Sequence, residues 1–509
     1  MSPRFFSQRG GTERLVRLLP MAVAFAYIES MTSSLERPSP YLLGNYAPVE
    51  REIDARDLKV HGEIPRDLAG VFVRNGANPR FRQKGRHHWF DGDGMIHALH
   101  FEDGRASYRN RWVRTWAFGE EEKAGGSLWT GTTERPDFSN PRGPLKDTSN
   151  TDLVYHAGRL YSLWWLGGAA YVVQVPSLET CGTETWGGQM PTVSAHPKVD
   201  AVTGEMMLFD YKPYPPYLTY AVVAPSGEIV HKTTIDFDAP RPQHDMAITE
   251  RFSILFDMSM RFDAELFARG HMRSRFYRDS PARIGLLPRR APGSEIRWFE
   301  ASPFYMYHTI NAWEEGDRVV LIGCKIDAPL VGDPQNPPRQ VPTVGFLRLE
   351  PNLYRWELDL ATGAVKEERL DDTLTEFPRM DNRALGRRTR YSYNPRISLT
   401  EPTVLFDGLV KYDLEAGRSD TLVYPEGRFG GEVVFAPRTG AKGEDDGYLI
   451  TFVCDEASGE SEAWVMDARN VSGPPLARVS IPQRVPTGYH AWWIGGDDLA
   501  AQRAMPLPA

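Results

Sequence analysis

Cysteine is scarce in this sequence: only three occur in 509 residues, at positions 181, 324 and 454. They are far apart and odd in number, so they form neither a disulfide framework nor a Cys-x-x-Cys metal site. A chain with so few thiols is typical of a reducing compartment, and we therefore expect a cytoplasmic protein.

Long apolar runs and an excess of basic charge are absent as well. No uncharged apolar run reaches the 18 residues of a membrane-spanning helix, and the net charge of −8 argues against a nucleic-acid binder. Near the N-terminus, basic residues precede a short apolar stretch that Pro20 interrupts. We interpret residues 1–40 as a disordered or leader segment, with a secretory signal as the alternative, and expect a single domain over residues 41–509.

Helical periodicity is also rare, and the best candidate is a short piece at RFDAELFARGHM, residues 261–272. Most of the chain instead alternates between short β-branched or aromatic runs, such as RVVLIGCKID and GYLITFVCDE, and turn signals such as DLATGAVKEE. Many short strands predict an all-β fold, either a large sandwich or a closed radial array. The length favours a β-propeller, in which residues far apart in sequence meet at the central axis.

Among the residue types that bind metals, only histidine has a distribution along the sequence that suggests a metal site. Of 12 histidines, four lie in strand-like apolar contexts: His196, His244, His308 and His490. A site made only of imidazole nitrogens would select a transition metal. The gaps between them match no local metal motif, however, so hydrogen-bonded core histidines remain the alternative from the residues alone.

A denser cluster, HHWFDGDGMIHALH, contains His87, His88, His97 and His100. If IHALH is a strand, His97 and His100 are three residues apart and point to opposite sides of it. We therefore interpret these four histidines as structural.

Several motifs, taken in order, resemble the carotenoid cleavage oxygenase family. They include GEIPRDLAGVFVRNGANP, HHWFDGDGMIH, AHPKVDAVTGEM, HDMAITERFSILFD, HTINAWEEGD, RFGGEVVFAPR and VPTGYHAWW. Each is weak alone, but their order along more than 90% of the chain is specific.

This resemblance implies a seven-bladed β-propeller with a small helical cap over the active-site face and a non-haem Fe(II) on its axis. It implies four iron ligands, which are His196, His244, His308 and His490. It also implies two carboxylates that accept hydrogen bonds from ligand imidazoles, Glu376 and Glu432, and a threonine near the O2 site, Thr151. The third carboxylate of the family is replaced here by Trp165, so one ligand histidine is expected to lack its charged partner.

The implied activity is the cleavage of a C=C bond of a carotenoid or apocarotenoid by O2, giving two carbonyl products. Cleavage of stilbenoid or phenylpropanoid alkenes on the same scaffold is the alternative, and a propeller that binds ligands without catalysis is a third. Stilbene-cleaving relatives carry a lysine and a glutamate where this chain has Trp164 and Trp165, which favours an apolar polyene. The expected partners are a small alkene and O2, without nucleic acid; peripheral contact with a membrane is compatible with such a substrate, and the oligomeric state is left open.

Overall fold

The computed structural model describes residues 39–262, 274–327, 343–344, 347–348, 350–401 and 403–502. The predicted leader at residues 1–40 lies almost wholly outside these ranges, as does most of the helix predicted at 261–272. Within the described residues, no helix combines the length and the apolar character needed to cross a bilayer.

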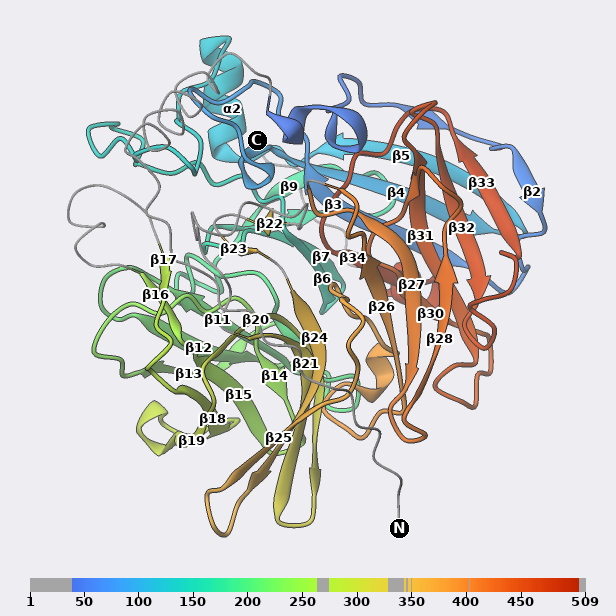
Figure 1. Ribbon diagram of the computed structural model, residues 1–509. Helices are drawn as coiled ribbons and strands as arrows, with labels where there is room; N and C mark the ends of the chain where they lie inside the picture. Colours follow the sequence, from blue (N-terminus) through green and yellow to red (C-terminus); the bar gives the residue numbers. More distant parts are fainter. Residues whose placement is uncertain are drawn as a thin grey trace, which may run out of the picture. The chain divides into compact units, whose positions relative to one another are not determined.

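The described strands form seven β-sheets that are the blades of a β-propeller, in agreement with the sequence-based prediction (Figure 1). The first three blades in chain order are β6–β9 (Asp152–His156, Arg159–Leu163, Ala170–Val173, Thr180–Glu184), β10–β13 (Lys198–Val199, Met206–Tyr211, Leu218–Val223, Ile229–Ile235) and β14, β15, β18, β19 (Ala247–Ile248, Phe252–Asp257, Ala282–Pro288, Arg297–Ala301). The next two are β20, β21, β24, β25 (Phe304–Glu315, Arg318–Asp327, Pro351–Asp359, Val365–Arg369) and β26–β28 (Tyr391–Ile397, Phe406–Asp413, Arg418–Val423).

The last two blades combine strands from both ends of the chain. One contains β29–β33 (Arg428–Phe429, Val434–Pro437, Gly447–Asp455, Ser461–Asp467, Ala477–Ile481) together with β2 (Val60–Gly62). The other contains β1 (Asp54–Ala55), β3 (Gly70–Ala77), β4 (Gly94–Glu102), β5 (Arg105–Trp112) and the late strand β34 (Ala491–Gly495). Two short ribbons, β16–β17 (Met260–Phe262, Ser274–Phe276) and β22–β23 (Thr343–Val344, Leu347–Arg348), lie outside the blades.

Closure of the ring depends on the pairing of β34 with β3. The two strands are antiparallel, with Gly70 opposite Gly495 and Arg74 opposite Ala491. In the adjacent blade, β2 pairs with β33 in the same manner. Early and late strands of the chain therefore share these two blades, and their hydrogen bonds hold the two ends of the ring together.

The innermost strands of neighbouring blades contact one another around the axis. Strand β34 contacts β30 on one side and β6 on the other, and β14 contacts β20. Central strands such as β3 and β11 are buried along their whole length, whereas the outer strand β13 alternates between half-buried and exposed residues up to its buried last residue. This gradient follows from blades that pack face to face near the axis and meet water at the rim.

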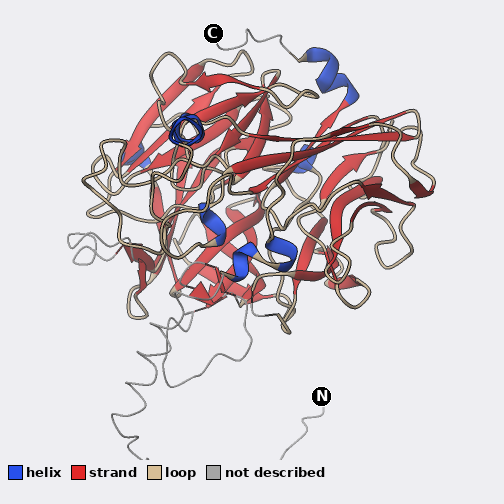
Figure 2. Cartoon of the chain, turned by 90° about the horizontal axis from the view of Figure 1, so that it is seen from above, coloured by secondary structure: helices blue, strands red, loops and turns tan. Residues whose placement is uncertain are grey.

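Helices are few, as the sequence predicts, and Figure 2 shows a chain made mainly of strands and loops. Helix α2 (Trp116–Ala124) begins after Thr115, whose side chain accepts a hydrogen bond from the Phe118 N–H, and ends at Gly125 with φ of 66°. Helix α4 (Gly496–Ala501) follows β34. Short 3₁₀ turns, η2 (Pro40–Leu42), η3 (Gly44–Tyr46), η4 (Trp89–Asp91), η5 (Gly293–Glu295) and η6 (Asn382–Ala384), complete the described helices.

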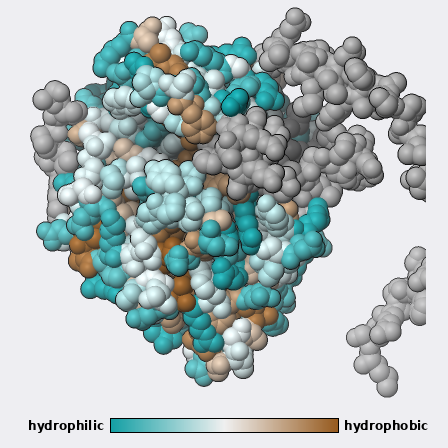
Figure 3. Space-filling view, turned by 90° about the vertical axis from the view of Figure 1, so that its left-hand side faces the viewer, coloured by the Kyte–Doolittle hydropathy of each residue, from teal (hydrophilic) through white to brown (hydrophobic). Residues whose placement is uncertain are grey.

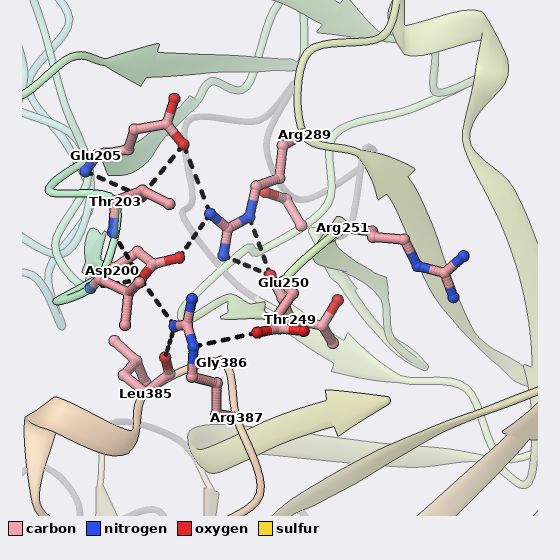
Figure 4. A network of polar contacts seen from close by, with 12 residues as sticks. Asp200, Thr203, Glu205, Thr249, Glu250, Arg251, Arg289, Leu385, Gly386 and Arg387 are labelled. Carbon is pink, nitrogen blue, oxygen red and sulfur yellow. Dashed lines mark hydrogen bonds and ion pairs between the residues drawn. The ribbon is translucent and has the colours of Figure 1, made fainter. Parts of the chain in front are cut away.

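A buried network of ion pairs joins loops of three blades (Figure 4). The fully buried carboxylate of Asp200, between β10 and β11, lies 2.7 Å from Arg289 and 2.8 Å from Arg387. Arg289 follows β18 and donates to the Thr249 carbonyl. Arg387, from the segment between η6 and β26, also pairs with Glu250 at 3.3 Å. The network holds this segment, which follows Glu376 in the chain, against two other blades.

Candidate metal centre and active site

Four blades each bring one predicted histidine to the axis. His196 and His244 precede the innermost strands β10 and β14, His308 lies within β20, and His490 directly precedes β34. All four side chains are buried. The structure thus brings together four residues whose successive gaps in the sequence are as long as 182 positions.

The imidazoles of these histidines surround a common point. Ring centroids lie 4.5 Å apart for His196 and His490, 4.7 Å for His196 and His244, and 4.7 Å for His308 and His490. Possible ligand nitrogens of His196, His308 and His490 all lie within 4.8 Å of one another, and Nε2 of His244 is 3.3 Å from Nε2 of His308. With metal–nitrogen bonds of about 2.1 Å, two adjacent ligands of one ion stand roughly 3 Å apart, so this separation suits a shared metal.

Two predicted carboxylates hold two of the rings. Glu376 accepts a hydrogen bond from Nδ1 of His308 at 2.5 Å, and Glu432 accepts one from Nδ1 of His490 at 2.8 Å. Both carboxylates are buried and come from the innermost segments of their own blades. A proton on Nδ1 leaves the lone pair on Nε2, which is the nitrogen that faces the other histidines.

Burial favours neutral imidazoles at this centre. It lowers the pKa of His196, His244 and His490 well below the ordinary value, and the neighbouring histidines reinforce the effect. At His308 burial also acts to lower the pKa, but the charge and hydrogen bond of Glu376 outweigh it, and the pKa is raised. Three of the four histidines are therefore neutral at pH 7, as metal ligands must be.

His244 has no carboxylate partner among the described residues; its one hydrogen bond is with His308. Trp165, at the position where the family resemblance predicts the third carboxylate, lines a cavity together with His244. The sequence-based expectation that one ligand histidine lacks its charged partner agrees with this geometry.

The cavity beside the histidines is apolar and has a volume of about 420 Å³. Aromatic rings make up most of its wall: Trp89, Phe90, Trp165, Tyr307, Phe377 and Tyr489. Thr151 also lines it, and its hydroxyl donates to Asn150 and accepts the Trp165 N–H. Trp164, which precedes Trp165 in the chain, is buried and is not one of the residues that line this cavity.

A second cavity, of about 610 Å³, reaches the histidines from another direction and is polar. Its wall includes His196, His308 and His490, and three carboxylates: Asp152, Asp245 and Glu432. Lys198 pairs with Asp245 at 2.6 Å, and Arg379 pairs with Glu432 at 2.9 Å. Sequence reasoning missed these charged residues, because each alone resembles a surface residue and only the fold places it at the axis.

The histidines interpreted as structural stay away from the centre. Buried His97 hydrogen-bonds the Tyr108 hydroxyl at 2.7 Å, and His87 hydrogen-bonds Gln83 at 3.1 Å. His88 accepts the Phe90 N–H at the start of η4. Among the described residues, one group of three potential ligands from histidine, cysteine, aspartate or glutamate has a geometry that could hold a metal ion. It consists of His196, His308 and His490.

Comparison with known proteins gives one consistent result. A family model described as retinal pigment epithelial membrane protein matches residues 46–495. The carotenoid 9,10(9',10')-cleavage dioxygenase 1 of Arabidopsis thaliana is 35% identical, covering 97% of this chain and 96% of that protein. The isoeugenol monooxygenase of Pseudomonas nitroreducens is 32% identical, over 90% and 99% of the two chains.

Solved structures agree with the sequence relatives. The lignostilbene dioxygenase of Pseudomonas brassicacearum superimposes with a TM-score of 0.82 at 28% identity, over 90% of this chain and 99% of that one. The apocarotenoid oxygenase of Synechocystis, crystallised as a variant, gives a TM-score of 0.78 at 27% identity, over 88% and 97%. A cobalt-substituted form of the Synechocystis enzyme is also similar, with a TM-score of 0.77 at 27% identity, over 88% and 96%.

Proposed function

This chain belongs to the retinal pigment epithelial membrane protein family, which includes carotenoid cleavage oxygenases, and we propose that it is a non-haem Fe(II) dioxygenase acting on a carotenoid or apocarotenoid. It is an oxygenase that cleaves alkenes oxidatively. One observation carries this proposal: four imidazoles from four blades converge beside an apolar cavity. In the reaction, one C=C bond breaks, and each alkene carbon receives one oxygen atom from O2 to become a carbonyl.

The residues at the axis fit a transition metal. Nε2 of His196 is buried and finds no hydrogen-bond partner among the described residues, an arrangement that costs free energy unless a ligand takes the lone pair. Four nitrogen donors suit iron better than calcium or magnesium, which prefer oxygen. We assign His196, His244, His308 and His490 as the ligands; bound iron would supply the site at which O2 is activated.

The protein side chains of the site orient the metal ligands and exclude water, and they do not exchange protons with the substrate. Glu376 and Glu432 hold two imidazoles with Nε2 toward the centre. The aromatic wall keeps water from the reacting alkene and binds hydrocarbon by burial. Thr151, whose carbonyl accepts the His490 N–H, lies on the same wall, and we place it beside the O2 position.

The polyene substrate is supported by the wall itself. Trp165 stands where a carboxylate would face the cavity, and its ring lies 5.1 Å from that of Phe90. Among the described residues, no lysine lines the cavity, so ionisation of a phenol finds no cationic partner in this part of its wall. Binding of an apolar chain through buried hydrocarbon area suits such a pocket.

Aromatic alkenes are the second candidate, and two observations favour them. The isoeugenol monooxygenase matches over nearly its whole length, and the lignostilbene dioxygenase superimposes closely.

We predict a cytoplasmic protein. Contact of this protein with a membrane surface would bring a polyene to the cavity. On the face drawn in Figure 3, hydrophobic residues form small patches between hydrophilic ones, which is usual for a protein surface. Leu43, Trp116 and Phe138, which are 50%, 58% and 54% exposed, are the candidates for such a contact.

A substrate panel tests the proposal. Protein loaded anaerobically with Fe(II) would receive O2 and apocarotenals, carotenoids, resveratrol-type stilbenes or isoeugenol, with the products identified by mass. We expect paired carbonyl fragments from a polyene. Rapid cleavage of an aromatic alkene without polyene turnover would favour the second candidate, and cleavage of no alkene by iron-loaded protein would contradict both.

A further inference from the structure

The innermost segment of each of the seven blades places a histidine or a carboxylate residue at the axis. Four give histidines, and two give carboxylates: His196, His244, His308, His490, Glu376 and Glu432. The remaining blade, β6–β9, places Asp152 there, as the first residue of β6. Its side chain is buried and lines the polar cavity beside His196 and His490.

The two assigned carboxylates follow a simple rule. Glu376 lies in the blade next to that of His308, Glu432 lies in the blade next to that of His490, and each accepts a hydrogen bond from Nδ1 of its neighbour. Asp152 lies in the blade next to that of His196 and faces the same ring atom. Its Oδ2 is 3.9 Å from Nδ1 of His196, which is longer than a hydrogen bond but close for a charge.

Asp152 also holds the backbone of His196. Its Oδ2 accepts the His196 N–H at 2.9 Å. His196 has φ of 70°, in the left-handed region, which is unfavourable for a residue other than glycine and persists only where the surroundings enforce it. The bond to Asp152 is one such constraint, and it leaves the unpartnered Nε2 on the other side of the ring.

Asp152 has no direct ion pair with lysine or arginine among the described residues, although Arg379 lies near enough to interact with its charge. The two other axial carboxylates of the polar cavity have partners, since Asp245 pairs with Lys198 and Glu432 with Arg379. Among the described residues, Asp152 accepts two backbone N–H groups, from Leu153 and His196, and forms no ion pair with lysine or arginine.

We propose that Asp152 is the third carboxylate of the centre, a positioning residue that orients His196 with Nε2 toward the metal. The blade in which Trp165 cannot give charged support to His244 thus supplies it through Asp152 to a different histidine, His196. This inference rests on the proposed four-histidine metal site.

Cobalt(II) is the probe, because its visible absorption reports ligand geometry. Asp152→Asn retains an oxygen that accepts the His196 N–H but removes the charge, whereas Asp152→Ala removes both. We expect Asp152→Asn to lower the affinity for Co(II) about 10-fold and to shift the visible bands, and Asp152→Ala to lower it by up to about 100-fold. Affinity is measured by equilibrium dialysis, and stability by urea unfolding of the metal-free proteins.

Asp257→Asn is the matched control. Asp257 is a buried aspartate on β15 that pairs with Arg241 and Arg283 away from the histidines. Its loss should reduce stability while the affinity for Co(II) and the spectrum stay those of the wild type. Wild-type affinity and spectrum in Asp152→Asn would overturn the inference about Asp152 alone. Failure of the wild-type protein to bind Co(II) or Fe(II) would instead overturn the proposed metal site.

Discussion

At the scale of single residues, the centre depends on which ring nitrogen each histidine turns inward. Nδ1 of His308 and of His490 faces a carboxylate, so Nε2 of each ring is free for a ligand. At His308 the negative charge of Glu376 also counteracts burial, which would otherwise lower the pKa of the ring and make it a weaker ligand. A substitution that keeps the shape of a carboxylate and removes its charge therefore isolates this effect.

Glu376→Gln is the clearest such change, because Glu376 forms no ion pair with lysine or arginine among the described residues. We expect the affinity for Fe(II) to fall about 10–100-fold, since the amide is a weaker acceptor for Nδ1–H of His308. Equilibrium dialysis under anaerobic conditions measures the change, and Glu415→Gln, at a half-exposed surface ion pair, is the control. An unchanged affinity in Glu376→Gln would remove its role in holding His308.

Asp147 gives the stability of the protein a defined pH dependence. It accepts N–H groups of Ser149 and Ala169, and burial raises its pKa to about 6. Because the folded pKa lies above the unfolded value, the folded protein holds the proton between about pH 4 and pH 6, and stability is lost as the pH rises through this window. The shift of about two units corresponds to about 3 kcal/mol.

Asp147→Asn should flatten this dependence. Urea unfolding of the metal-free protein at pH 4.5 and pH 7 should show that the wild type loses more stability than the variant on going to pH 7. Equal differences in the two proteins would contradict the raised pKa.

At the scale of elements, residues of both strands and loops tie blades together. The segment after η6 is held by Asn311 of β20, whose side chain donates to the carbonyls of Ala384 and Arg387. The Asp200 network then connects the same segment to two further blades. Both ties stabilise the stretch of chain that follows Glu376.

Asp200→Ala should be strongly destabilising. It would leave the buried Arg289 with only the more distant carboxylate of Glu205, at 3.5 Å, and loss of one partner of a buried ion pair costs about 3–5 kcal/mol. Urea unfolding measures this loss. Glu415→Ala, at the exposed pair with Arg388, should cost less than about 1 kcal/mol. A comparable small cost for Asp200→Ala would show that the network contributes little.

The sequence predicts the strands of this protein better than its helices or its charged residues at the axis. Strands with turn signals, such as RVVLIGCKID, are evident because alternating or continuous apolar runs follow the pleat of a sheet. Helix α2 was missed, although Thr115 and Gly125 at its ends are ordinary cap residues. Asp152 and Arg379 were also missed, since nothing in a sequence distinguishes a charge on the axis from one on the surface.

At the scale of the whole molecule, the late strand β34 both closes the ring and delivers His490 to the axis. The N–H of His490 donates to the Thr151 carbonyl of the first blade, while β34 pairs with β3. The family resemblance predicted the seven blades and their iron ligands. Periodicity alone could not, because loops of unequal length separate the blades and hide any repeat.

Removal of β34 should therefore abolish closure and metal binding together. A chain that ends at Thr487 lacks His490 and the buried Ile494. We expect it to unfold at a lower temperature than the wild type and to retain no stoichiometric iron, as measured by thermal melting and by metal analysis. A chain that ends at Gln502 keeps β34 and α4 and is the control. A wild-type melting temperature in the shorter chain would contradict the role of β34.

Product analysis of two histidine variants tests the central claim most directly. Both His490→Ala and His97→Ala remove a buried imidazole, but only His490 faces the other three axial histidines. After anaerobic Fe(II) loading and addition of O2 with a cleaved alkene, mass spectrometry should detect both carbonyl products with His97→Ala and neither with His490→Ala. Full cleavage by His490→Ala would contradict the four-histidine iron centre.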